Sequence, residues 1–315
     1  MIRGLRTGAL LAAATLATFS MGPARAESAD PIKIGLHDWT GEHLTARIAG
    51  TILEKKGFKV EYVTIDYLSG LVAMESGDIS FMPELWDTTA GEAMAKADAS
   101  GKTERLGALG PDAREDWWYP LYMKEKCPGL PDWQALLKCG EAFSTPETAP
   151  KGRYMGMTGT WGGYDEERAE ALKLPFVVVD SGTEAAMYAE LQSAYERKAP
   201  IMLWVYSPHW VSSKFEGEWV QFPPYAEGCY TDPKWGVNPD KPYDCGKPTG
   251  KIWKYGVGDM KTKWPTAYAV LKAYTIDGAE LNLMVGAVDL EQKPIEEVVA
   301  AWMTKHEAEW QAWGK

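Results

Sequence analysis

The amino-acid sequence predicts an α/β protein made of two lobes. Two segments, 32–83 and 153–206, each alternate apolar strand-like runs with amphipathic helical stretches of about 10–15 residues. This alternation is typical of a mostly parallel sheet with helices on both faces. About 289 residues follow position 26, more than one small hydrophobic core usually holds. The length therefore favours two such units.

The first unit begins with a short apolar strand and continues through two helix–strand repeats. Its first helix has apolar residues at helical spacing and ends at Gly57, as glycine commonly follows a helix C-terminus. Trp39 and Trp86 fall at strand ends, where open α/β sheets bind ligands. The expected elements are strand 32–36, helix 42–56, strand 58–65, helix 68–76 and strand 78–83.

The second unit repeats this order after a connecting region. Trp161 follows its first strand, and Trp204 lies inside its last one. Near the C-terminus, residues 294–313 have the spacing of a single amphipathic helix. The expected elements of the second unit are strand 153–158, helix 165–172, strand 175–179, helix 184–197 and strand 201–206.

The four cysteines fall in two close pairs, Cys127/Cys139 and Cys229/Cys245. Four cysteines allow three connectivities, and sequence distance favours the two local ones, each contributing about 3 kcal/mol. A zinc site built from all four thiolates is the alternative, although no CxxC spacing is present. Residues 222–250 are rich in proline and contain the second pair, which predicts a disulfide-clamped surface excursion.

The N-terminus has the three parts of a secretory signal peptide. Arg3 and Arg6 form a charged start, residues 8–19 an apolar run, and residues 24–26 an Ala-Arg-Ala cleavage pattern. The apolar run is shorter than the ~20 residues of a membrane-spanning helix. Residues 1–26 are therefore predicted to be removed, and the mature chain is expected in the periplasm.

The net charge excludes one class of partner. The chain carries a formal charge of −11, and loss of three arginines but no acid with residues 1–26 changes this to −14. Nucleic-acid binding requires a basic surface, so no nucleic acid is expected as a partner. The acidic balance mildly favours a cationic or neutral small ligand.

The sequence gives no positive support for catalysis. It contains no GxSxG, HExxH, P-loop or SxxK motif. We therefore expect a protein that is not an enzyme and requires no cofactor. A secreted hydrolase is kept as the alternative from another functional class.

Fifteen tryptophans are more than a core of this size needs, because indoles are large and their N–H must find a partner. Several indole faces around one point form an aromatic cage for a quaternary ammonium group. A carbohydrate-binding site also uses tryptophan platforms. Five tryptophans lie in glycine-, proline- or acid-flanked segments that favour loops: Trp39, Trp86, Trp117, Trp161 and Trp204.

The segment Glu115-Asp116-Trp117-Trp118-Tyr119 places two carboxylates beside three aromatic rings. A carboxylate can complement a cation or hold the polar end of a small ligand, while the indoles contact its methyl groups. A solvated acidic loop is the equally weighted alternative. Three or four cation–π contacts of roughly 0.5–2 kcal/mol each make micromolar binding plausible.

Oxygen donors in the proline-rich excursion suggest a structural calcium ion. Carboxylate and carbonyl oxygens are the ligands that calcium prefers, although the regular DxDxDG spacing is missing. The candidate ligands are Asp232, Asn238, Asp240 and Asp244.

Three segments together resemble a known family. They are LSGLVAMESGDISFMPELW (68–86), HDWTG (37–41) and SPHW (207–210). They are similar to the OpuAC-type substrate-binding proteins of ABC importers for glycine betaine, proline betaine, choline and related osmolytes. The EDWW element (115–118), the paired cysteines and the proline-rich excursion most resemble the trimethylamine N-oxide-binding members.

The resemblance implies a type II periplasmic-binding fold whose two lobes close on the ligand about hinge crossovers. Lobe one would comprise 27–119 plus 213–315, and lobe two 120–212. The partners implied are a small methylated amine and the membrane permease of an ABC importer, with the receptor itself a monomer. By resemblance the cage would use Trp39, Trp86, Glu115, Trp117, Trp161 and Trp204.

One position departs from the family pattern. The family usually has tryptophan two residues before the proline of PHW, where this chain has Tyr206. Trp204 shares a strand face with Tyr206, so both are candidates for the cage.

The polar end of the ligand decides between family substrates. Glu115 would repel the carboxylate of a betaine and would accept the hydroxyl of choline. It would help an N-oxide oxygen only if a proton is shared between the two. The family resemblance favours trimethylamine N-oxide, with glycine betaine and choline as alternatives.

Overall fold

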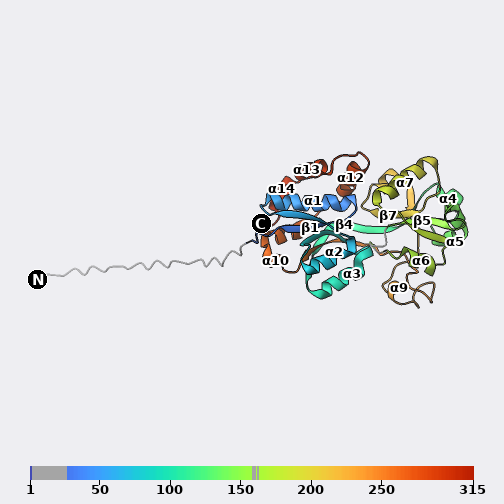
Figure 1. Ribbon diagram of the computed structural model, residues 1–315, viewed down its shortest axis with the longest axis horizontal. Coiled ribbons are helices and arrows are strands. Elements are labelled where there is room, and N and C mark those ends of the chain that lie inside the picture. Colours follow the sequence, from blue (N-terminus) through green and yellow to red (C-terminus); the bar gives the residue numbers. More distant parts are fainter. Residues whose placement is uncertain (2–26, 158–160, 162) are drawn as a thin grey trace.

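The computed structural model describes residue 1, residues 27–157, residue 161 and residues 163–315 (Figure 1). The expected signal peptide therefore lies outside the described residues, apart from Met1. Within the described part of the chain, no helix is both long and apolar enough to cross a membrane.

Two α/β lobes are connected by one long strand, β4 (Thr103–Pro120), which runs from one lobe into the other (Figure 1). The strand order is β2-β1-β3-β9-β4-β7-β5-β6, with β8 also paired to β4. The first lobe contains β1 (Ile32–Leu36), β2 (Val60–Thr64), β3 (Phe81–Trp86) and β9 (Gly250–Val257). The second contains β5 (Gly152–Gly156), β6 (Phe176–Asp180), β7 (Leu203–Ser207) and β8 (Gly217–Trp219).

The sheet is mixed. In the first lobe β1 lies parallel to β2 and β3, and in the second β5 lies parallel to β6 and β7. The strand β9 is antiparallel to β3 and β4, and β7 is antiparallel to β4. The predicted α/β class with two parallel units is thus confirmed, while the antiparallel strands β4 and β9 were not expected.

Helices cover both faces of each lobe, as the alternating pattern predicts. In the first lobe α1, α12 and α13 lie over one face of the sheet, and α2 and α3 lie over the other (Figure 1). The helices of this lobe are α1 (Thr40–Lys55), α2 (Tyr67–Ser76), α3 (Asp87–Ser100), α10 (Met260–Lys263), α11 (Pro265–Ala273), α12 (Gly278–Asp289), α13 (Ile295–Lys305) and α14 (Glu307–Ala312).

In the second lobe, α6 and α7 lie on opposite sides of its strands (Figure 1). Short helices and turns occupy the remaining connections. The helices of this lobe are α4 (Met123–Lys126), α5 (Leu136–Cys139), α6 (Asp165–Ala171), α7 (Glu184–Arg197), α8 (Val211–Lys214) and α9 (Gly228–Thr231), with 3₁₀ turns at Trp133–Ala135 and Gly140–Phe143.

The strand β4 changes partners along its length. Up to Ala113 it pairs with β9, and from Arg114 onward it pairs with β7 and β8. Its pairing with β9 is irregular around Gly110, whose φ is +138° and whose absent Cβ would lie 2.3 Å from the carbonyl oxygen of Ile276. Glycine is the residue that adopts this backbone conformation without steric cost.

One expectation from the sequence needs correction, while the expected lobe bounds stay a prediction. After residue 212, the strand β8 pairs with Trp118–Pro120 at the end of β4. The single helix expected at 294–313 is two helices, α13 and α14, separated at His306. The ring of His306, between the two helices, stacks on Trp302 and contacts Glu280.

Candidate ligand-binding site

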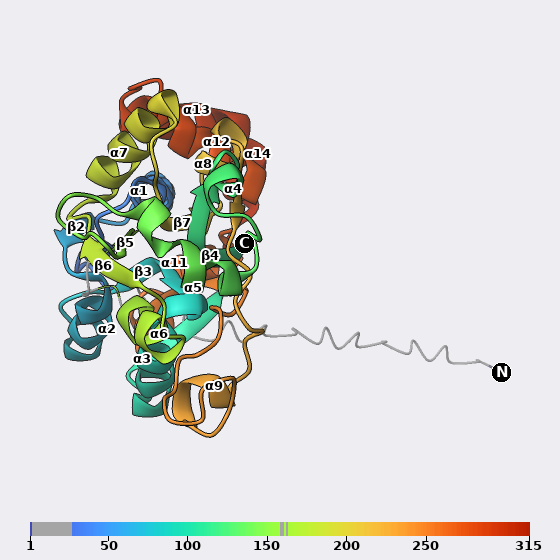
Figure 2. The ribbon, with the colours of Figure 1, turned by 90° about the vertical axis from the view of Figure 1, so that its right-hand side faces the viewer.

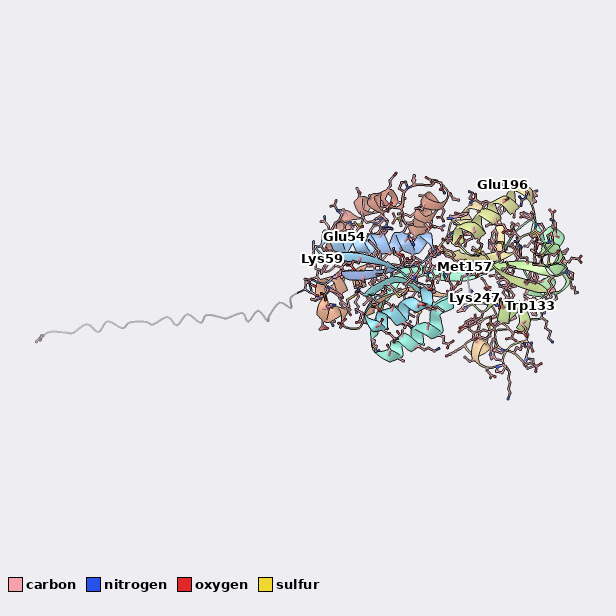
Figure 3. The ribbon with its side chains drawn as sticks, viewed as in Figure 1. Glu54, Lys59, Trp133, Met157, Glu196 and Lys247 are labelled. Atoms are coloured by element: carbon pink, nitrogen blue, oxygen red, sulfur yellow. A yellow bond between two sulfur atoms is a disulfide. The ribbon has the colours of Figure 1, made fainter. Side chains whose placement is uncertain are left out.

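A cavity lies between the two lobes and encloses about 460 Å³ of empty space, its opening included. Both lobes contribute to its wall, and Met157 and Lys247 lie where the lobes meet (Figure 3). The lining residues are Trp39, Tyr67, Trp86 and Thr89 from the first lobe, Glu115 from β4, and Met157, Trp161, Asp165, Trp204, Tyr206 and Lys247 from the second lobe side.

The two indoles of the first lobe are oriented by one buried carboxylate. Trp39 precedes α1 and Trp86 ends β3, and each donates its Nε1–H to Oε2 of Glu84, at 3.0 and 3.2 Å. Thr45 donates to the other oxygen of Glu84 at 2.8 Å. Burial raises the pKa of Glu84, against the effect of these hydrogen bonds. Glu84 therefore determines how both rings face the cavity.

Six aromatic rings surround the cavity in several orientations. Trp39 and Trp161 approach across the lobes with ring centroids 4.9 Å apart and an interplanar angle of 67°. Trp86 and Tyr206 are 5.3 Å apart at 89°. Rings in several orientations present several faces to one volume, which is the arrangement that cation–π attraction to a methylated ammonium requires.

Glu115 supplies the polar side of the cavity. Thr88 and Thr89 donate their hydroxyls to its Oε1, and Trp204 donates Nε1–H to its Oε2 at 3.1 Å. The carboxylate is buried on β4 between the two lobes. Glu115 thereby plays for Trp204 the orienting role that Glu84 plays for the first-lobe indoles.

The sequence interpretation missed five lining residues: Tyr67, Thr89, Met157, Asp165 and Lys247. Lys247 reaches the cavity from the end of the proline-rich excursion, and its Nζ lies 3.8 Å from Oε2 of Glu115. Tyr67 contacts Trp39 edge to face at 5.3 Å. A tyrosine at a helix start has no distinguishing local pattern. The only sequence signal for Lys247 was its position two residues after Cys245.

Trp117 does not line the cavity, so the expectation that it does is wrong. Its indole is fully buried and stacks on Tyr154, with centroids 3.9 Å apart and an angle of 11°. Its Nε1–H is donated to Asp165, which does line the cavity. Trp117 pairs directly with Trp204 and so lies on the same face of the sheet, but there the rings of Tyr154, Phe176 and Phe222 cover its indole.

The loop placement expected for the tryptophans is also wrong for those in strands. Trp86, Trp117 and Trp204 belong to β3, β4 and β7. Both Trp204 and Tyr206 line the cavity, as their shared strand face allows. The structure thus brings together six of the seven predicted binding residues: Trp39, Trp86, Glu115, Trp161, Trp204 and Tyr206.

Buried polar contacts connect the lobes beside the cavity. Glu184, the first residue of α7, accepts hydrogen bonds from the Tyr206 hydroxyl and from the backbone N–H of Thr40 in the first lobe. Asp289 of the first lobe accepts from Trp210 Nε1 at 2.7 Å. Burial raises the pKa of Glu184 to about 8, the hydrogen bond from Tyr206 opposing this effect.

A pH dependence follows from Glu184. Because its pKa is higher in the folded protein than in the unfolded chain, its stabilising contribution is complete below about pH 4.5 and is lost as the pH rises through about 8. Replacement of Glu184 by Gln should therefore flatten the fall in Tm between pH 6.5 and 8. The measurement is the thermal denaturation of both proteins across this window.

Between pH 6.5 and 8, the titration of Glu184 can be distinguished from that of the buried histidines. Burial lowers the pKa of His209 to about 3 and that of His37 to about 4, so both stay neutral above pH 6.5. Asp289, whose pKa burial also raises, is present in both proteins. Equal slopes of Tm against pH for wild type and Glu184→Gln would contradict the assignment of this pH dependence to Glu184.

Both expected disulfides are present, Cys127–Cys139 and Cys229–Cys245. The second closes the excursion, which projects beside α6 around α9 (Figure 2).

In the described part of the chain, no three His, Cys, Asp or Glu side chains form a group that could hold a metal. The four expected calcium ligands instead take part in local hydrogen bonds. Asp244 accepts from the backbone N–H of Asn238, and the side chain of Asn238 accepts from the backbone N–H of Asp240. Asp232 accepts from the backbone N–H of Lys234.

Comparisons with known proteins agree with this geometry. Residues 30–305 match the family model described as OpuAC, substrate binding domain of ABC-type glycine betaine transport system. The trimethylamine N-oxide-binding protein of Pelagibacter ubique is 29% identical over 294 residues, covering 90% of this chain and 91% of that protein. The glycine betaine/proline betaine-binding periplasmic protein of Salmonella typhimurium is 24% identical over 314 residues, covering 93% and 91%.

The fold is shared with solved structures. An ABC-transporter choline binding protein in complex with choline superposes with a TM-score of 0.69 at 17% identity, covering 89% of this chain and 90% of that chain. The two-lobed fold is thus shared with that choline binding protein. The family model covers nearly all described residues. The chain therefore belongs to the OpuAC family of substrate-binding domains of ABC-type glycine betaine transport systems.

Proposed function

We propose that this protein is the periplasmic receptor of an ABC importer and captures trimethylamine N-oxide between its lobes. The observation that carries the proposal is the aromatic box, in which rings from both lobes enclose one small cavity with Glu115 on its polar side. A box of this kind contacts several methyl groups of one ammonium at once. Closure of the two lobes would complete it.

The compact shape of the box favours a compact ligand. The cavity, about 460 Å³ with its opening included, has room for a small ligand, and neighbouring rings in its wall contact one another with centroids 4.9–6.1 Å apart. The Pelagibacter relative, named as a trimethylamine N-oxide-binding protein, supports this choice. Glycine betaine and choline are the alternatives, because the family model is described by glycine betaine transport.

The cellular setting of the proposal comes from the sequence and the family. The signal-peptide pattern places the mature chain in the periplasm, where it would deliver its ligand to a membrane permease as a monomer. Members of this family are transport receptors, and the proposed function needs neither catalysis nor a cofactor.

Titration of the purified mature protein with trimethylamine N-oxide, choline and glycine betaine tests the proposal. We expect a change in tryptophan fluorescence with a micromolar Kd for the N-oxide, equivalent to about −8 kcal/mol, and weaker responses to the other two. A sugar panel serves as the negative control. Tighter binding of glycine betaine or choline would keep the receptor but replace its ligand, and no response to any methylated amine would overturn the proposal.

A further inference from the structure

The cavity contains one basic residue among its described lining residues, Lys247, and nothing in the aromatic box explains it. Its side chain is 3% exposed, and its ammonium lies 3.8 Å from Oε2 of Glu115. A buried lysine is rare unless it is paired. A cation is also unfavourable beside a site for a methylated ammonium, because like charges repel. Glu115 supplies a counter-charge to Lys247, and a ligand with a negatively charged oxygen would supply a second partner.

The ammonium retains hydrogen-bonding capacity toward the cavity. A lysine ammonium has three donors, and its distance to Glu115 is beyond that of a normal N–H···O bond. No other described residue accepts a hydrogen bond from it. A ligand oxygen in the cavity can supply the missing acceptor.

The backbone around Lys247 is held in place by three independent contacts. The disulfide Cys229–Cys245 closes the excursion two residues earlier. The buried guanidinium of Arg168 donates to the carbonyl oxygen of Cys245 at 2.7 Å, and the backbone N–H of Lys247 donates to Asp116 at 3.1 Å. The clamped excursion therefore delivers Lys247 to the cavity in a defined position.

Lys247 offsets negative charge at the cavity wall. Its Nζ faces Glu115 at 3.8 Å, while the buried Arg168 behind the wall is shared by Asp116 at 2.8 Å and Asp165 at 3.3 Å. Lys247 thus reduces the electrostatic advantage that these carboxylates give a net cation over a dipolar ligand of zero net charge. The pairing also removes the repulsion that an isolated Glu115 would exert on a negatively charged ligand oxygen.

We propose that Lys247 is a specificity residue, which donates a hydrogen bond to the anionic oxygen of a zwitterionic methylated amine and discriminates against cationic ones such as choline. The inference rests on the proposed function and deepens it. In an N-oxide the oxygen is bonded directly to the nitrogen held in the box. It therefore remains beside the rings, where Lys247 and Glu115 lie together at the cavity wall. In choline the ligand keeps its net positive charge, which Lys247 repels.

The test compares wild type with Lys247→Met, which keeps an unbranched side chain one atom shorter and removes its charge and donors. Each protein is titrated calorimetrically with trimethylamine N-oxide, glycine betaine and choline. We expect the affinity for the N-oxide to fall at least tenfold, as for a lost charged hydrogen bond, and that for choline to stay equal or rise. Lys241→Met is the matched control, because Lys241 lies on the same excursion, exposed and paired with Glu170; it should bind as wild type does.

A double variant separates direct contact from simple neutralisation of Glu115. If Lys247 only balanced that carboxylate, Glu115→Gln combined with Lys247→Met would recover the affinity for the N-oxide. Recovery would overturn the proposal, as would an equal loss for all three ligands or no loss for the N-oxide. Failure of wild type to bind any methylated amine would instead overturn the proposed function, so the two failures are distinguishable.

Discussion

Replacement of Glu84 by Ala is expected to weaken methylated-amine binding about a hundredfold. Its Oε2 accepts the indole N–H groups of both Trp39 and Trp86, and Ala leaves both donors without an acceptor in a buried environment. A buried donor without a partner costs about 1–3 kcal/mol, and the rings can recover this only by turning away from the cavity. Roughly 3 kcal/mol expressed in binding corresponds to about a hundredfold in Kd.

Glu84→Gln is the matched control, because its amide oxygen can still accept from both indoles while its amide N–H₂ faces the Thr45 hydroxyl. It should retain affinity within a few fold of wild type. Isothermal titration gives Kd, and near-ultraviolet circular dichroism reports whether the tryptophans keep a fixed environment. Wild-type affinity in Glu84→Ala would show that the orientation of these rings does not depend on Glu84.

Replacement of Trp117 by Ala is expected to destabilise the fold by about 3–5 kcal/mol, the range for large aromatic residues removed from a core. The indole is fully buried, stacks on Tyr154 and packs edge to face on Phe176 and Phe222. A loss of this size lowers Tm by roughly 10 °C in a protein of a few hundred residues. Thermal and urea denaturation measure it.

Trp117→Phe separates packing from the hydrogen bond to Asp165. It keeps an aromatic ring against Tyr154 but removes the N–H donor, so it should recover most of the lost stability. Below the unfolding transition, both variants should bind the ligand within a few fold of wild type. A stable Trp117→Ala protein that has lost binding would instead restore Trp117 to the cage.

The local elements of both lobes could be predicted because their signals are local. Helix α7 and strand β1 have the expected bounds, since helical and strand periodicity is visible within one turn or a few residues. The strand β4 was not predicted. Its two halves pair with β9 and β7, which lie far apart in sequence, and its acidic, glycine-containing composition does not favour a strand.

The residues of the candidate site also fall into two groups, those that local patterns in the sequence predict and those that they do not. Trp39 and Trp86 could be placed because strand ends in an α/β sheet converge on one edge, and strand alternation places Trp204 and Tyr206 on one face. The position of the Trp117 side chain could not be predicted, because strand alternation gives the face of the sheet but not whether a residue on that face lines the cavity or the adjacent core. The choice depends on which ring from another strand covers it, here Tyr154.

By itself the sequence determined the fold class, the two α/β units and most aromatic residues of the cavity, and it favoured the two disulfide pairs that the structure contains. The tertiary structure alone decided the path of β4, the burial of Trp117, the contact of Glu184 with the opposite lobe and the entry of Lys247 into the cavity. The physical reason is the range of the interactions. Periodicity, capping and turn preferences act over a few neighbouring residues, whereas burial and charge pairing depend on segments that meet only after the chain has folded.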